Sequence, residues 1–109
     1  MWLTSLHRAE WTHAIAQHVF RGVLSDEDAS RFYIAFEADR EANVWAEISI
    51  PDAAYETAME LARKHGPQIP MRTLDTLHVA CALELGAKEF WTFDQRQARL
   101  AKAAGLATR

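Results

Sequence analysis

The sequence contains little cysteine, glycine or proline: one cysteine (Cys81), four glycines and three prolines in 109 residues. A single cysteine excludes an internal disulfide and is typical of a reducing compartment, so we expect a cytoplasmic protein. Half of the residues are hydrophobic and a quarter are charged. With so few chain-breaking residues, this composition excludes collagen-like and disordered chains and predicts that residues 1–109 form one globular domain.

Long apolar runs and an excess of positive charge are also missing. No run approaches the ~18 apolar residues that cross a bilayer, so no membrane partner is expected. The N-terminus also lacks the basic start and apolar run of a signal peptide. The formal net charge is −3, which counts against a protein that coats nucleic acid passively. It counts less against an enzyme that cuts RNA at an acidic metal site, because there the metal supplies the positive charge.

Hydrophobic periodicity and capping signals predict a helix-rich α/β chain. Helices are expected over residues 5–21, 25–43, 51–66, 73–85 and 95–104, and strands over 44–50 and 89–93. The second strand is apolar throughout, as in parallel strands buried on both faces. A strand, two helices and a second strand imply a parallel pair, and the chain ends 1–4 and 106–109 could add short strands.

Asp94 stands where the strand "EFWTF" meets the last helix. It can cap that helix, since Asp94 and Gln97 have capping-box spacing. It can also bind a metal ion, because ligands of open α/β sheets bind at the carboxyl ends of strands. A carboxylate there would bind Mg²⁺ or Mn²⁺ through oxygen. The two interpretations are compatible, and the local sequence leaves both open.

Two further acids have weaker local signals. Asp75 lies in the first turn of helix 73–85, where the helix dipole favours a negative charge in any case. Since Leu74 and Leu77 are expected to point inward, Asp75 is predicted at the margin of the buried stripe. Glu10 lies on the polar face of the first helix, where a glutamate is usually just solvated. His78 and Cys81 fall on the apolar stripe and are predicted to be core residues.

Together these segments resemble PIN-domain proteins, particularly the VapC-like toxins of bacterial toxin–antitoxin pairs. The resemblance rests on "LDTLHVACALELGA", "FWTFDQRQ" and "LAKAAGL" between residues 72 and 106, and on "TSLHRAEWTHAI" at 4–15. It implies a Mg²⁺- or Mn²⁺-dependent endoribonuclease with acidic residues at the carboxyl ends of parallel strands. The family's acidic positions match Glu10, Asp75 and Asp94, which are therefore the expected catalytic residues and metal ligands.

The same resemblance suggests substrate contacts and partners. Thr92 matches the hydroxyl residue that often precedes the last acid, and Arg72 and Arg96 are candidate contacts to RNA phosphates. The expected partners are an RNA substrate and an antitoxin protein.

The family also has a strand bearing its first aspartate, and helices, before the Thr-Ser pair found here at Thr4 and Ser5. We therefore expect an N-terminal truncation of roughly 30 to 40 residues, with the central strand of the sheet missing. The strand edge so exposed, with the apolar residues Trp45, Trp91 and Phe93, predicts a homo-oligomer.

Three hypotheses compete. The leading one is a PIN-type endoribonuclease, active or impaired by truncation. The second is a catalytically inactive PIN remnant that works as a protein-binding module, and it predicts no stoichiometric Mn²⁺ site. The third is an unrelated helical protein with capped helices, which would cleave no RNA even with an aspartate-bearing strand restored.

Overall fold

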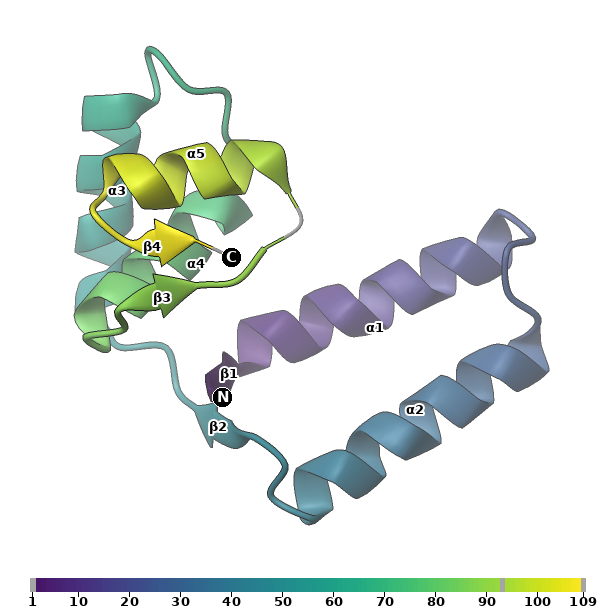
Figure 1. Ribbon diagram of the computed structural model, residues 1–109. Helices are drawn as coiled ribbons and strands as arrows, with labels where there is room; N and C mark the ends of the chain where they lie inside the picture. Colours follow the sequence, from purple (N-terminus) through teal and green to yellow (C-terminus); the bar gives the residue numbers. More distant parts are fainter. Residues whose placement is uncertain (1, 93, 109) are drawn as a thin grey trace. The chain divides into compact units, whose positions relative to one another are not determined.

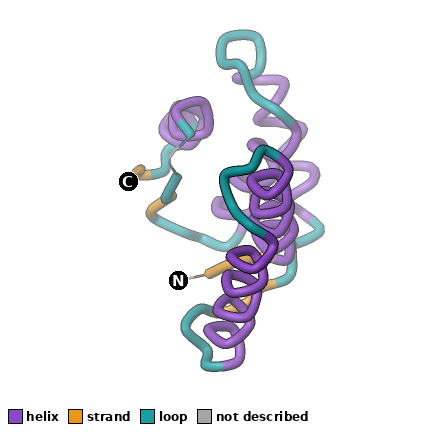
Figure 2. Tube along the Cα trace, turned by 90° about the vertical axis from the view of Figure 1, so that its right-hand side faces the viewer, coloured by secondary structure: helices purple, strands orange, loops and turns teal. Residues whose placement is uncertain are grey.

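The computed structural model describes residues 2–92 and 94–108. The chain divides into two compact units, unit 1 (Met1–Ile50) and unit 2 (Pro51–Arg109). The elements along the described chain are β1 (Trp2–Thr4), α1 (Ser5–Phe20), α2 (Asp26–Glu41), β2 (Ala46–Ile48), α3 (Ala53–His65), α4 (Thr73–Glu84), β3 (Glu89–Phe90), α5 (Gln95–Ala103) and β4 (Ala107–Thr108). Figure 2 shows that helices make up most of the chain and that the strands are short. No helix among the described residues is both long enough and apolar enough to cross a membrane.

Unit 1 consists of the helical hairpin α1–α2 and a parallel strand pair, β1 with β2 (Figure 1). The hairpin can turn because Gly22 takes a φ of 75°, a left-handed conformation that costs glycine little. Ser25 then starts α2 with a reciprocal capping box: its Oγ accepts from the Asp28 N–H at 3.0 Å, and Asp28 Oδ2 accepts from the Ser25 N–H at 3.3 Å.

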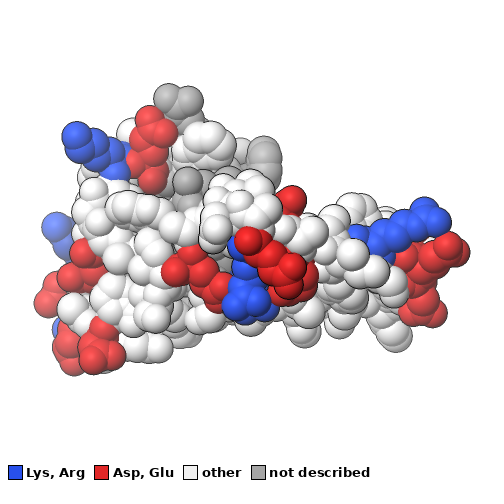
Figure 3. All heavy atoms as spheres, turned by 90° about the horizontal axis from the view of Figure 1, so that it is seen from below, with Lys and Arg blue, Asp and Glu red and all other residues white. Residues whose placement is uncertain are grey.

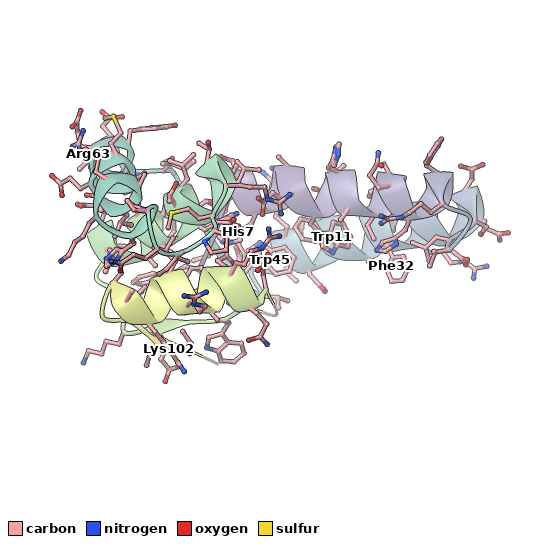
Figure 4. The ribbon with its side chains drawn as sticks, turned by 90° about the horizontal axis from the view of Figure 1, so that it is seen from above. His7, Trp11, Phe32, Trp45, Arg63 and Lys102 are labelled. Atoms are coloured by element: carbon pink, nitrogen blue, oxygen red, sulfur yellow. The ribbon has the colours of Figure 1, made fainter. Side chains whose placement is uncertain are left out.

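Aromatic rings hold the two helices of unit 1 together. Trp11 of α1 stacks on Phe36 of α2 with ring centroids 4.4 Å apart, and it meets Tyr33 edge to face at 6.1 Å. Phe36 in turn contacts Trp45, just before β2, at 4.7 Å. Figure 4 shows Trp11 between the two helices. These contacts link α1, α2 and the start of β2 through one aromatic row.

Unit 2 consists of α3, α4 and α5 with the parallel pair β3 and β4 (Figure 1). Small residues on α3 and α4, including the buried Ala54, Ala58 and Ala80, let these two helices pack closely. The two strands are joined by α5, which packs on α4 through the fully buried Leu100 and Ala101. Parallel strands need a long crossover connection of this kind, and β3 and β4 are indeed parallel.

All five predicted helices are present, and the fold is a helix-rich α/β fold with short parallel strands. The terminal segments do form strands, and each takes part in one of the two pairs. The predicted strands 44–50 and 89–93 therefore pair with terminal strands and not with each other. They are also shorter than expected, at 46–48 and 89–90.

The expectation that segment 89–93 is buried on both faces is wrong. Phe90 is buried, but Glu89 is exposed and Trp91 is 66% exposed. The physical reason is that β3 pairs with β4 alone among the described residues, which leaves the flanking apolar side chain of Trp91 uncovered. Phe93, the last residue of the predicted strand, lies outside the described residues.

Candidate active site

In unit 2, the two candidate aspartates start helices at the same end of the unit. Asp94 follows β3 and is the N-cap of α5. Asp75 lies in the first turn of α4, and α4 returns to the start of β3 through the short connection 85–88. The N-terminal ends of α4 and α5 consequently both lie toward the carboxyl end of β3 (Figure 1). This is the edge at which open α/β folds bind ligands.

Asp94 is a helix cap, as its spacing predicted. Its Oδ1 accepts hydrogen bonds from the backbone N–H groups of Arg96, at 2.9 Å, and Gln97, at 3.3 Å. Only Oδ1 takes part in the hydrogen bonds found among the described residues, so capping leaves Oδ2 available. Asp94 therefore caps α5 through one carboxylate oxygen, and its predicted role as a metal ligand stays a prediction.

Thr92 holds this cap in position. Its Oγ1 accepts from the Asp94 N–H at 3.0 Å and donates to Gln97 Oε1 at 2.7 Å. In a standard capping box the Gln97 side chain would bind the Asp94 N–H itself, whereas here the Thr92 hydroxyl stands between them. The structure thus shows Thr92 as a positioning residue for Asp94, and its predicted contact with substrate stays a prediction.

Asp75 is buried, with 6% of its surface exposed, whereas the neighbouring Leu74 is 43% exposed. The predicted place of Asp75 at the margin of the buried stripe, with Leu74 pointing inward, is therefore wrong. The reason is that α4 buries its small side chains, among them Val79, Ala80 and Cys81, on a face broader than a leucine stripe. His78 and Cys81 are core residues as predicted, and burial raises the pKa of the Cys81 thiol.

The buried Asp75 carboxylate is held by Arg72. Asp75 Oδ2 accepts from the Arg72 backbone N–H at 2.9 Å, and Arg72 Nε lies 4.0 Å from the same oxygen. Within the described residues Oδ1 accepts no hydrogen bond from protein. Because a buried carboxylate is costly unless it is paired or coordinates a metal, a free oxygen on Asp75 fits a cation-binding role.

Glu10 lies in the second turn of α1, after the carboxyl end of β1, and is partly buried. It belongs to unit 1, whereas both aspartates belong to unit 2, so its place in a common site stays a prediction. Across residues 2–92 and 94–108, no three His, Cys, Asp or Glu side chains form a group that could hold a metal ion. Two carboxylates remain a suitable donor set for Mg²⁺, which commonly binds one or two carboxylates and keeps several waters.

Both candidate phosphate contacts lie beside the aspartates. The side chain of Arg72 is 73% exposed, and that of Arg96 is 50% exposed, with Nε 3.9 Å from Asp94 Oδ1. Each arginine can therefore reach an anion in solvent while staying near a carboxylate. The N-terminal ends of α4 and α5 add the positive end of a helix dipole at the same places.

A family model described as PIN domain matches residues 2–103. The chain belongs to the PIN-domain family. No curated protein and no solved structure gives a significant match. The PIN domain is a nuclease-type fold, and PIN domains generally depend on divalent metal ions and typically bind RNA.

The PIN chain also contains an ionic cluster that the local sequence did not reveal. Arg8 contacts Glu37 at 2.9 Å and Glu47 at 3.2 Å, and Arg40 contacts the same two glutamates at 3.2 and 2.7 Å. This four-residue ring links α1, α2 and β2 of unit 1. Figure 3 shows acidic and basic side chains beside one another on the visible face.

The ring changes the acidity of its members. Hydrogen bonds from Arg8, and then from Arg40, lower the pKa of Glu37 below the ordinary value of 4.5. The bond from Arg40 lowers the pKa of Glu47 in the same way, and Glu47 raises the pKa of Arg40. The only signal in the sequence was the spacing of Glu37 and Arg40 by three residues, one helical turn.

Proposed function

We propose that this PIN-domain protein is a Mg²⁺- or Mn²⁺-dependent endoribonuclease. The observation that carries the proposal is that Asp75 and Asp94 both stand at helix starts of unit 2, at the first turn of α4 and at the N-cap of α5. Each has one oxygen committed to backbone N–H groups and the other available. Asp75 and Asp94 are the proposed metal ligands in unit 2.

When bound, the metal ion supplies a more acidic water and stabilises negative charge on the scissile phosphate. The protein contributes positioning. Backbone N–H groups fix one oxygen of each aspartate, so that the second oxygen is presented without conformational search. Arg72 and Arg96 bind phosphate oxygens of the RNA, and the N-terminal ends of α4 and α5 favour the same anion. Thr92 keeps Asp94 in its capping conformation.

The resemblance to VapC-like proteins supports a more specific role. We propose a cytoplasmic toxin of a toxin–antitoxin pair, bound by an antitoxin protein and self-associated. Exposed apolar side chains support the association, since Phe20 is 85% and Ile34 70% exposed on the hairpin of unit 1.

A second candidate is an inactive PIN domain that acts only by binding protein. Two observations favour it. The described residues contain no group of three metal-binding side chains, and large apolar side chains are exposed in both units. An inactive domain of this kind would bind its partner without a metal ion.

The test is RNA cleavage and Mn²⁺ binding by the wild type, Asp75→Asn and Asp94→Asn. Asp52→Asn is the matched control, because Asp52 is the N-cap residue of α3 and its side chain makes no capping bond. We expect metal-dependent cleavage by the wild type and the control, and its loss in both site variants. Stoichiometric Mn²⁺ binding without cleavage would show a metal-binding protein that is not a nuclease. The absence of both Mn²⁺ binding and cleavage would favour the inactive domain.

A further inference from the structure

A hollow of about 570 Å³ lies between α3 and α4 in unit 2. Its lining includes Tyr55, Met59, Met71, Arg72, Thr73 and Thr76. We call it the α3–α4 hollow. All of its lining residues belong to unit 2, and its size falls in the range typical of small-molecule sites.

The alternation of large and small residues on α3 creates the hollow. Tyr55 and Met59 are one turn apart on this helix, as are Ala58 and Ala62. The alanines leave the floor open, while Tyr55 and Met59 stand beside it with 51% and 45% of their surfaces exposed. The phenol ring of Tyr55 offers a flat face for stacking, and the thioether of Met59 adds flexible apolar surface beside it.

The rim of the hollow is polar and carries a positive charge. Thr76 also lines the hollow, but it is buried and its Oγ1 donates to the Thr73 carbonyl at 2.8 Å. Thr73 is exposed, and the Arg72 side chain is 73% exposed. Apolar walls with the Thr73 hydroxyl and the Arg72 guanidinium at the rim match a nucleobase with its phosphate. An apolar helix from a protein partner would leave these polar groups without a match.

Arg72 joins the hollow to the candidate active site. It lines the hollow, and its backbone N–H also donates to Asp75 Oδ2. Its Nε is 4.0 Å from the same carboxylate oxygen. A phosphate held by Arg72 would therefore lie next to the Asp75 carboxylate, with the adjoining base at the mouth of the hollow.

We propose that the α3–α4 hollow binds an unpaired base of the RNA substrate, next to the phosphate held at Arg72. Tyr55 stacks on the face of the base, and the Thr73 hydroxyl contacts its edge. This inference rests on the proposed function and adds to it a base-binding subsite in the α3–α4 hollow. Bases paired in a helix cannot reach such a recess.

The first experiment measures the binding of fluorescent single-stranded RNA with Ca²⁺ in place of Mn²⁺, using Tyr55→Ala and Tyr55→Phe. Loss of one stacking contact at a half-exposed ring should weaken binding about five- to tenfold. Tyr55→Phe, which keeps the ring, should bind like the wild type. Phe32→Ala, which removes an aromatic ring of similar exposure (46%) from α2 of unit 1, is the control and should leave affinity unchanged.

The second experiment changes the RNA and compares the wild type with Tyr55→Ala. RNAs with one abasic position each are bound to the wild type and to Tyr55→Ala. One position should weaken binding by the wild type and should have no effect on Tyr55→Ala. Equal sensitivity of the two proteins, equal affinity for double-stranded RNA, or no RNA binding at all would overturn the inference.

The two proposals fail in different ways. If the wild type cleaves RNA with Mn²⁺ but Tyr55→Ala binds RNA normally, the hollow has no role in RNA binding and the proposed function stands. If Tyr55 and one base are coupled but no condition gives cleavage, the hollow binds RNA and the proposed endoribonuclease is wrong. If Tyr55→Ala loses binding to a protein partner in the absence of RNA but keeps its RNA affinity, the hollow binds a peptide and the inference is wrong.

Discussion

Replacing Asp94 separates its two roles, because the cap and the proposed metal site use different oxygens. Asp94→Asn keeps an acceptor at Oδ1 for the N–H groups of Arg96 and Gln97. Since Asn caps a helix about as well as Asp, only the interaction of the charge with the helix dipole is lost, about 0.3–1 kcal/mol. Asp94→Ala removes both hydrogen bonds and should cost about 0.5–2 kcal/mol.

In thermal unfolding, 1 kcal/mol corresponds to about 4–8 °C for a domain of up to 100 residues. We expect the midpoint of Asp94→Asn to fall by a few degrees at most and that of Asp94→Ala to fall further. Mn²⁺ affinity should behave differently. Mutation of the residues that support metal ligands typically lowers metal affinity about 10–100-fold. Loss of the ligand charge itself should therefore lower Mn²⁺ affinity at least as much in both variants.

The assays are calorimetric titration with Mn²⁺ and cleavage of a single-stranded RNA, with Asp52→Asn as the control. If Asp94→Asn binds Mn²⁺ and cleaves RNA like the wild type, Asp94 is a helix cap only, and the proposed site is wrong. A loss of Mn²⁺ binding in Asp94→Ala alone would show that the metal needs an ordered α5 and not the carboxylate.

Asp75→Asn should abolish Mn²⁺-dependent cleavage while the helix content, followed by circular dichroism, stays unchanged, because Asn can still accept from the Arg72 N–H; retained cleavage would remove Asp75 from the site. Thr92→Val should lose two hydrogen bonds and lower the unfolding free energy, measured by chemical denaturation, by about 1–3 kcal/mol. It should also slow cleavage because Asp94 is displaced, and unchanged stability would contradict the positioning role. The lowered pKa values of Glu37 and Glu47 mean that their contribution to stability is present above their ordinary value of 4.5 and is lost as pH falls through the lower folded values. Unfolding midpoints from pH 7 to 3 should therefore drop less steeply for the double variant Glu37→Gln/Glu47→Gln than for the wild type, and equal slopes would show that the ring is not stabilising. Sedimentation over a range of concentrations should show self-association driven by the exposed apolar residues, and a monomer at every concentration would exclude the proposed oligomer.

Interactions between near neighbours in the chain were predictable. Gly22 and Gly86, both with a left-handed backbone, follow the ends of α1 and α4 as expected. Ser25 and Asp94 cap the N-terminal ends of α2 and α5. These features depend on hydrogen bonds and backbone conformations within a few residues, so the local sequence is sufficient to specify them. The helix-rich α/β class and the carboxylate at the start of α5 followed from the same local signals.

Tertiary packing decided what the local pattern left open. The local pattern favoured Leu74 as the buried residue, but α4 instead buries Asp75, because small residues let neighbouring helices approach that face. Strands β3 and β4, which α5 separates in the sequence, form a parallel pair. Arg8 forms an ion pair with Glu47, which is 39 residues away in the sequence. Side-chain periodicity describes one element at a time, whereas burial and ion pairing depend on which elements pack together. The sequence by itself therefore determined the helices, their caps and the acidic candidates, and only the tertiary structure determined which carboxylate is buried and what holds it.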